Sequence, residues 1–312
     1  MEPLKNGMVI QRSHMFALFF LFLIVPIKTI AHQKSADLIV FSYDRPLQLH
    51  ALLSSMKQYV TNINTTFVIY RSSNEFYDHA YQEVMTLFSD TQFFKQGTEP
   101  KKDFKPLTLN CLNQTNSTHV LFATDDDIIT DYVDINQCVE ILETTGAYGF
   151  YLRLGTNITH SYYQNIALTL PPMADTTPDI VSFSFDDGQS YWAYPNNVDM
   201  TIYNKSIIQP AFTQLSYYSP NILESRWARL YKIIGRGLCF KKSKGVNLPL
   251  NIAQDDWHNK NEELFSTTQL LNLWNQGYTM DISSFYKINN CSAHMPYTPT
   301  FIQRPVVAPK EL

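Results

Sequence analysis

The first half of the chain alternates short apolar runs with segments whose apolar residues recur every three or four positions. The short runs have the length and the β-branched and aromatic content of buried strands, whereas the longer spacing is typical of amphipathic helices. Strand-type runs cover residues 37–42, 66–71, 91–94 and 119–124, and helical patterns cover residues 49–60, 77–88 and 107–112. Because strands that alternate with helices are joined by right-handed crossovers, this order predicts an α/β fold with a mainly parallel sheet.

Three consecutive carboxylates follow the fourth strand-type run, at Asp125, Asp126 and Asp127. Burying them costs free energy unless a positive charge lies between them. Mg²⁺ or Mn²⁺ would supply that charge, since hard divalent cations prefer oxygen ligands. In an extended chain Asp125 and Asp127 would share one side and Asp126 would take the other. The alternative is an acidic strand-to-helix turn in which one aspartate caps the helix.

Polar side chains also lie at the ends of the first two strand-type runs. Ser42, Asp44 and Arg45 end or follow the first run, and Arg71 ends the second. In open α/β sheets ligands bind beyond the carboxyl ends of the strands, so these residues and the aspartates are expected at one edge. That edge would suit a nucleotide. Asp44 has the alternative role of a helix cap, with Pro46 at the first helical position.

The second half of the chain is less regular. We expect strands at 149–154 and 180–185, a tight turn at 186–189, and helices at 204–215, 221–234 and 264–274. Residues 235–237 contain two glycines and are expected to form a hinge or loop. Several prolines in 296–312 predict a tail. The sequence therefore predicts a leading segment at 1–34, one domain at 35–295 and a tail at 296–312.

The leading segment has the pattern of a targeting signal. Lys5 and Arg12 precede an apolar run at 15–25, and small residues follow it. This order matches a secretory signal peptide. The run is shorter than the roughly 20 residues that span a bilayer, so a signal-anchor that uses flanking residues is the alternative. We expect a secretory or membrane-associated protein.

Composition and cysteine spacing further restrict the class of protein to which this sequence can belong. The net charge of −4 and the pI near 6.0, with no basic stripe, argue against a nucleic-acid partner. The four cysteines form no Cys-x-x-Cys pair. Cys111 and Cys138 fall on apolar positions of helical patterns and are expected as free buried thiols. Cys239 and Cys291 would be candidates for one disulfide in an exported chain.

The order of elements resembles the GT-A fold of DxD-containing, family 2-like nucleotide-sugar glycosyltransferases over roughly residues 35–274. Residues 40–46 are similar to the first strand and loop of these enzymes, and residues 107–127 look like the unit that leads to their DxD motif. Residues 198–206 are similar to the segment that closes over the donor sugar. Residues 221–230 fall where many relatives carry an acidic motif. The resemblance implies a Rossmann-like sheet with helices on both faces.

The resemblance also implies an activity and a cofactor. These enzymes transfer a sugar, here of the hexosyltransferase type, from a donor such as a UDP- or GDP-sugar to a glycan or lipid-linked acceptor. Mn²⁺ or Mg²⁺ would bridge the two phosphates of the donor. On this reading Asp127 is the direct metal ligand, Asp125 contacts the ribose or the metal, and His258 is the third ligand, with His294 second. The residues expected around the nucleotide are Ser42, Asp44, Arg45, Arg71, Asp125 and Asp126.

Glu224 is the candidate general base in an inverting displacement. Alternatively, Glu224 has only a structural role in the first turn of a helix, where its negative charge interacts favourably with the positive end of the helix dipole. Three other carboxylates compete for the catalytic role, namely Asp186, Asp187 and Asp256. Three aromatic residues are expected either to stack on sugar or to pack in the core, namely Trp192, Tyr194 and Trp227.

Two other classes of protein stay open. A nucleotidyltransferase also uses a parallel sheet and metal-binding carboxylates, but that class usually has a Gly-rich basic loop after the first strand. Residues 43–47 contain no glycine, which disfavours it. A non-catalytic carbohydrate-binding protein on a GT-A scaffold is the other alternative, and the intact Asp125 and Asp127 weigh against it.

Overall fold

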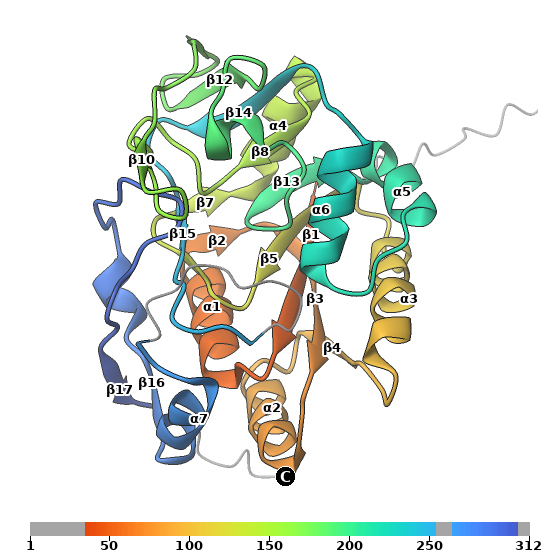
Figure 1. Cartoon of the computed structure of the whole chain (residues 1–312), viewed down its shortest axis with the longest axis vertical. Coiled ribbons are helices and arrows are strands. Elements are labelled where there is room, and N and C mark those ends of the chain that lie inside the picture. The colour runs from red at the N-terminus through yellow and green to blue at the C-terminus, as the bar shows by residue number, and fades with distance from the viewer. Residues whose placement is uncertain (1–34, 254–263, 305–312) are drawn as a thin grey trace, which may run out of the picture. The chain divides into compact units, whose positions relative to one another are not determined.

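A mixed sheet forms the centre of the protein (Figure 1). The computed structural model describes residues 35–253 and 264–304. The described part of the sheet has nine strands in the order β11-β12-β14-β8-β13-β5-β1-β3-β4. In chain order these are β1 (Ala36–Tyr43), β3 (Ile63–Arg71), β4 (Gln92–Lys95), β5 (His119–Thr124), β8 (Gly149–Tyr151), β11 (Met173–Asp175), β12 (Ile180–Ser184), β13 (Thr201–Asn204) and β14 (Arg236–Phe240).

Most strands of this sheet run in one direction. β4, β3, β1 and β5 are parallel neighbours, and β8 is parallel to β14. β13 is antiparallel to both β5 and β8, and β12 is antiparallel to both β14 and β11. Among the described strands of the sheet, β13 and β12 therefore run against the other seven. The predicted α/β fold with a mainly parallel sheet is confirmed.

The alternation of side chains along β1 explains why the sheet is covered on both faces. Leu38 and Val40 belong to one hydrophobic core, whereas Ile39 and Phe41 belong to another, and all four are buried. A strand that is apolar on both faces must be covered on both faces. The continuous apolar run in the sequence thus specifies a central strand.

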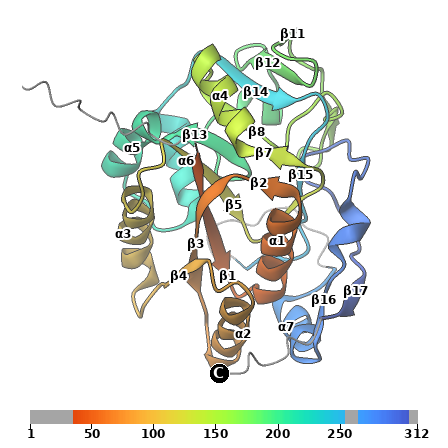
Figure 2. The same cartoon turned by 180° about the vertical axis from the view of Figure 1, so that it is seen from behind.

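Helices supply that cover (Figures 1 and 2). The described helices are α1 (Pro46–Tyr59), α2 (Glu75–Leu87), α3 (Pro100–Asn113), α4 (Ile135–Thr145), α5 (Lys205–Gln214), α6 (Pro220–Leu230) and α7 (Thr267–Asn275), with short 3-10 helices η1 (Ser190–Ala193) and η2 (Ile282–Phe285). α1, α2, α4 and α7 contribute to the core on the Leu38 face. α3, α5 and α6 contribute to the core on the Ile39 face. The predicted cover of helices on both faces is confirmed.

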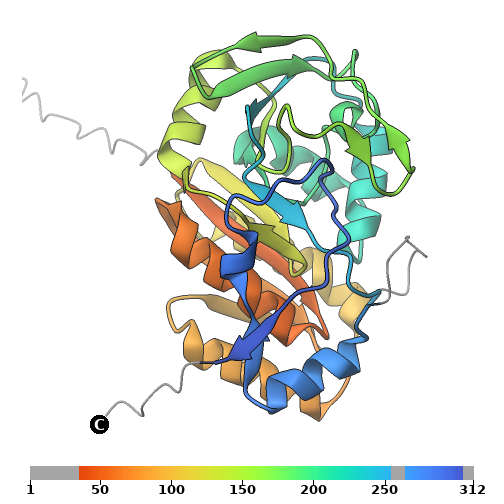
Figure 3. The same cartoon turned by 90° about the vertical axis from the view of Figure 1, so that its left-hand side faces the viewer.

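Short strand pairs complete the described structure. They are β2 (Val60–Thr61) with β7 (Val133–Asp134), β6 (Asp127–Ile129) with β15 (Gly245–Asn247), β9 (His160–Ser161) with β10 (Ile166–Ala167), and β16 (Tyr278–Met280) with β17 (Phe301–Gln303). The blue C-terminal part of the chain runs back along the domain in Figure 3. Residues up to 304 of the predicted tail therefore contribute structure, because β17 pairs with β16.

Three further expectations can be compared with the structure. Residues 236 and 237 begin β14 and pair with β12, so the prediction of a hinge there is wrong. All four cysteines are free: Cys111, Cys138 and Cys239 are buried and Cys291 is exposed, so the proposed Cys239–Cys291 disulfide is absent. The leading segment 1–34 lies outside the described residues. Within the described ranges, no helix combines the length and apolar character needed to cross a membrane.

Candidate active site

A cavity of about 520 Å³ opens at the edge where β1, β3, β5 and β8 end. Residues at or just beyond the carboxyl end of each of these strands line it, together with residues from α6 and from the C-terminal segment. The predicted cluster of polar side chains at one edge of the sheet is therefore present. The lining residues from the strand ends are Ser42, Tyr43, Arg45, Arg71, Asp125, Asp126 and Arg153.

The Arg45 guanidinium lies between the first two aspartates. Its Nη1 donates to Asp125 Oδ1 at 2.9 Å and to Asp126 Oδ2 at 3.1 Å. Its Nε donates to Asn251 Oδ1 at 2.8 Å. Asp125 Oδ2 accepts hydrogen bonds from Ser42 Oγ at 2.9 Å and from the Tyr43 backbone N at 3.1 Å. Arg45 thus supplies a positive charge between two of the three consecutive carboxylates.

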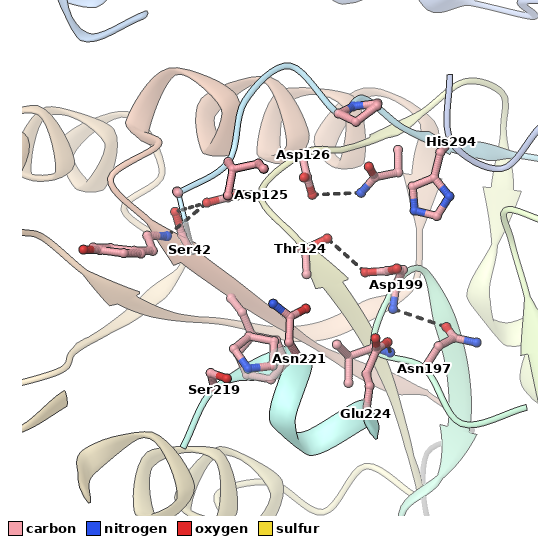
Figure 4. Close-up of a pocket in the computed structure, with 18 of the residues that line it drawn as sticks. Ser42, Thr124, Asp125, Asp126, Asn197, Asp199, Ser219, Asn221, Glu224 and His294 are labelled. Carbon is pink, nitrogen blue, oxygen red and sulfur yellow. Dashed lines mark hydrogen bonds between the residues drawn. The ribbon is translucent and has the colours of Figure 1, made fainter. Parts of the chain in front are cut away.

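Burial raises the pKa of Asp125 to about 6, against the opposing effect of Arg45. Asp125 is only 3% exposed, and Ser42 and Tyr43 hold it in place. Through these two hydrogen bonds, the Asp125 carboxylate fixes the loop after β1. Asp126 is more exposed and faces the cavity (Figure 4).

Asp127 is placed differently from its neighbours. The chain turns at Asp125 and Asp126, and Asp127 starts β6. The expectation of an extended triplet, with Asp125 and Asp127 on one side, is therefore wrong. Asp127 is fully buried, accepts a hydrogen bond from the Thr124 backbone N at 3.0 Å, and does not line the cavity. Burial and the nearby Asp199 raise its pKa well above the usual value.

Asp44 also lies outside the cavity lining. Its Oδ1 accepts a hydrogen bond from the Ser73 backbone N at 2.8 Å, which ties the loop after β1 to the loop after β3. Arg45 is the N-cap residue of α1 and makes no side-chain capping bond, so the proposed cap by Asp44 is absent. Arg71 lines the cavity with its guanidinium 4.3 Å from the Tyr43 ring centroid.

A second charged group occupies the other side of the cavity. Arg153 Nη2 donates to Asp199 Oδ2 at 2.7 Å, and Nη1 lies 3.2 Å from His294 Nε2. Burial and Arg153 hold the pKa of His294 well below its ordinary value, so the ring is neutral. Because arginine only donates, His294 Nε2 accepts, and Nδ1 carries the proton toward the Tyr191 hydroxyl oxygen 3.1 Å away.

Glu224 lies on α6 and faces the cavity (Figure 4). Its Oε1 accepts a hydrogen bond from the Val198 backbone N at 2.6 Å. Burial, followed by the charge of Asp199, raises the pKa of Glu224 to about 8. A carboxylate with a raised pKa in a cavity has the properties of a general base.

The competing residues are placed elsewhere or lie outside the described ranges. Asp186 and Asp187 are exposed and do not line the cavity. Trp192 and Trp227 are at most 1% exposed and pack in the cores, whereas Tyr194 lines the cavity. His258 and Asp256 lie outside the described residues.

Sequence reasoning did not single out two of the charged lining residues, Arg153 and Asp199. Arg153 follows β8, so the rule that ligands bind at strand ends would have found it. Asp199 precedes β13 rather than following it. Because β13 is antiparallel to its neighbours, its amino end lies at the same edge as their carboxyl ends. That reversal was not visible in the sequence.

No protein-family model matches the sequence. The chain is 28% identical over 189 residues to a bifunctional glycosyltransferase, pgtA, of Dictyostelium discoideum, which covers 55% of this chain and 24% of that protein. The chain thus spans about a quarter of the length of that relative. The match confirms the predicted resemblance to glycosyltransferases.

The likeness of this chain to solved structures is partial. TarS from S. aureus in complex with UDP has a TM-score of 0.44 and 13% identity over 67% of this chain and 59% of that chain. A 4-diphosphocytidyl-2C-methyl-D-erythritol synthase from Anaerococcus prevotii has a TM-score of 0.36 and 10% identity over 71% of this chain and 92% of that chain. With TM-scores this low, neither likeness supports a function for this chain.

The donor set of the cavity fits a divalent cation only in part. Within residues 35–253 and 264–304, no three His, Cys, Asp or Glu side chains are grouped so as to hold an ion. Asp126 is a partly exposed carboxylate on the cavity; its Oδ2 accepts from Arg45 and its Oδ1 from Asn247, and each oxygen keeps a second lone pair. His294 has both ring nitrogens engaged by Arg153 and Tyr191. Mg²⁺ commonly takes one or two protein carboxylates and completes its shell with phosphates and water. Asp126 fits such a site.

Proposed function

We propose that the protein is a glycosyltransferase that moves a sugar from a nucleotide-sugar donor, a UDP- or GDP-sugar, to an acceptor hydroxyl of a glycan or lipid-linked molecule. The observation that carries the proposal is that Glu224 and the polar side chains at the strand ends line one cavity (Figure 4). The similarity to a glycosyltransferase over 189 residues supports the same class.

The donor would bind over the ends of β1, β3 and β5. Arg45 and Arg71 line this part of the cavity, and guanidinium groups suit the phosphates of a nucleoside diphosphate. Ser42, Tyr43 and Asp125 fix the loop that carries Arg45. These contacts position the leaving group and stabilise the charge that develops on it.

We propose that Mn²⁺ or Mg²⁺ binds together with the donor and that Asp126 would be the residue that holds it. When bound, the ion would offset the charge on the leaving diphosphate. The sequence prediction names Asp127, Asp125 and His258 as ligands, and that assignment stays a prediction. The buried position of Asp127 favours Asp126 as the group that reaches the ion.

Glu224 would remove the proton of the acceptor hydroxyl in an inverting displacement. The hydrogen bond from Val198 orients its carboxyl group, and the raised pKa makes it a stronger base than an exposed glutamate. Asp199 and its partner Arg153 line the same side of the cavity as this base. The hydrogen bond from Arg153 Nη2 holds the Asp199 carboxylate in place.

A thermal-shift screen tests donor binding. The protein lacking residues 1–34 would be heated with a panel of UDP- and GDP-sugars, each with and without Mn²⁺. We expect one donor to raise the melting temperature, and Mn²⁺ to enlarge the rise. Arg71→Met should reduce this shift, whereas Arg229→Met on the exposed side of α6 should not. A cooperative melt with no shift from any nucleotide sugar would contradict the proposal.

We further propose that residues 1–34 direct the chain to the secretory pathway or anchor it at a membrane. The basic and apolar order of this segment supports the proposal. Expression of the full chain in a eukaryotic host, followed by fractionation and mass spectrometry of the amino terminus, tests it. Recovery of an intact, untranslocated chain in the cytosol would contradict it.

A further inference from the structure

The two sides of the cavity differ in charge. Arg45, Arg71 and Lys101 line the side formed by β1, β3, β5 and α3 together with Asp125 and Asp126, so the formal charges there leave one net positive charge. His294, Asp199 and Glu224 lie on the opposite side in Figure 4. Among the described lining residues, the one cationic side chain on that side is Arg153. Arg153 is already bonded to Asp199, and its Nη1 faces His294. That side is therefore neutral when Glu224 is protonated and negative when it is ionised.

Aromatic rings cover the same side. Tyr163 lies on the segment between β9 and β10, Tyr191 belongs to η1, and Tyr194 follows η1. All three line the cavity. Tyr194 is 37% exposed, and the charges of Glu224 and Asp199 add to burial in raising its pKa above the usual value. Tyr194 thus lines the same cavity as the proposed base.

The other two rings are held in place by His294. The Tyr163 ring centroid is 4.3 Å from that of His294, and the Tyr191 ring centroid is 5.4 Å from it. The Tyr191 hydroxyl oxygen accepts a hydrogen bond from the Tyr162 backbone N at 3.2 Å. His294 is therefore a positioning residue that fixes two aromatic walls.

Hydroxyl and amide groups surround these rings. Ser161, Gln164 and Ser190 line the cavity beside them, and Ser190 Oγ donates to Ser161 Oγ at 3.0 Å. Aromatic faces flanked by hydroxyl and amide groups match the chemistry of a sugar, which has apolar ring faces and hydroxyl edges. A phosphate or carboxylate would meet Glu224 and Asp199 at close range, and like charges repel in a buried cavity.

We infer that this side of the cavity, walled by Tyr163, Tyr191 and Tyr194, binds an uncharged saccharide as the acceptor. The inference rests on the proposed function and narrows its acceptor, because it excludes a lipid phosphate or an acidic sugar at the subsite next to Glu224. Tyr194 supports the saccharide ring that presents its hydroxyl to Glu224.

Two measurements test the inference. Saturation-transfer difference NMR would compare neutral oligosaccharides with a polyprenyl phosphate and a uronic-acid disaccharide. Initial rates of transfer from the donor would then be measured with the same acceptors. The variants are Tyr194→Ala and Tyr163→Ala, and the control is Phe76→Ala, which removes an aromatic ring that is 64% exposed on α2 and away from the cavity.

We expect a neutral saccharide to bind and to accept sugar. Tyr194→Ala should raise its KM or Kd at least about fivefold and the KM of the donor by less, because a lost aromatic contact is worth roughly 1 kcal/mol or more. Phe76→Ala should change neither. An acceptor that is anionic at the reacting sugar, or a neutral acceptor whose KM and Kd are unchanged in both tyrosine variants, would overturn the inference.

The same measurements separate this inference from the proposed function. If the protein turns over no donor but still binds a neutral saccharide in a Tyr194-dependent way, the proposed function fails and the inference about the subsite holds. If donor turnover is normal and the tyrosine variants behave like Phe76→Ala, the inference fails and the proposed function holds.

Discussion

At the scale of single residues, Glu224 gives the clearest pH prediction. Its pKa of about 8 is raised by burial and then by Asp199. A carboxyl group that is protonated cannot accept a proton, so activity should rise with pH up to and through about 8. Glu224→Gln should lower kcat about 10²-fold or more and remove this rise. pH profiles of kcat and of kcat/KM between 6 and 9.5 measure both effects, and unchanged profiles in Glu224→Gln would exclude it as the base.

A second residue-scale prediction concerns the aspartates. Asp126 faces the cavity, whereas Asp127 is buried behind the lining, where burial and Asp199 raise its pKa. A change at position 127 should therefore leave the ion-facing group of the cavity in place. We expect Asp126→Asn to abolish the effect of Mn²⁺ on donor binding and Asp127→Asn to retain it, as measured by titration of the donor with and without Mn²⁺. The reverse result would restore Asp127 as the metal ligand.

The sequence predicted part of the site at this scale. Ser42, Arg45, Arg71, Asp125 and Asp126 line the cavity because each lies at or follows the carboxyl end of a parallel strand. The inward turn of Asp127 depends on the pairing of β6 with β15, which joins residues more than a hundred positions apart. Contacts of that range leave no local pattern in the sequence.

At the scale of elements, the first half of the fold was predictable. The β1, β3, β4 and β5 strands are apolar runs of the expected length, separated by helices with a clear apolar face. The second half was harder, because β8 and β15 are three residues long and β13 is four. Two glycines made residues 235–237 look like a loop, although Gly237 pairs with Phe183 of β12.

An element-scale prediction tests the structured part of the C-terminal segment. β17 pairs with β16, the Phe301 ring centroid is 5.3 Å from that of Phe265, and the Arg304 guanidinium is 3.5 Å from the Trp274 ring centroid. Truncation after residue 295 should lower the free energy of unfolding by about 2 kcal/mol or more. Truncation after residue 304, which keeps β17 and Arg304, is the matched comparison. Urea titrations of both proteins measure the difference, and equal midpoints would show that β17 contributes nothing.

At the scale of the whole molecule, the described domain should fold without the leading segment. Ala36 is fully buried at the start of β1, and the Ser35 hydroxyl group lies 3.2 Å from that of Ser117. The domain therefore has ordered contacts from residue 35 onward. A protein of residues 35–312 should melt in a single cooperative transition by calorimetry. A broad, non-cooperative transition would show that the domain needs residues 1–34.

The central claim is that this cavity transfers sugar from a nucleotide donor. The most direct measurement is the release of nucleoside diphosphate from a panel of UDP- and GDP-sugars, with Mn²⁺ and a mixture of neutral saccharide acceptors. We predict release from one donor, dependence of the rate on acceptor, and loss in Glu224→Gln. If no donor is consumed by a protein that melts cooperatively, or if Glu224→Gln is as active as the native chain, the account is contradicted.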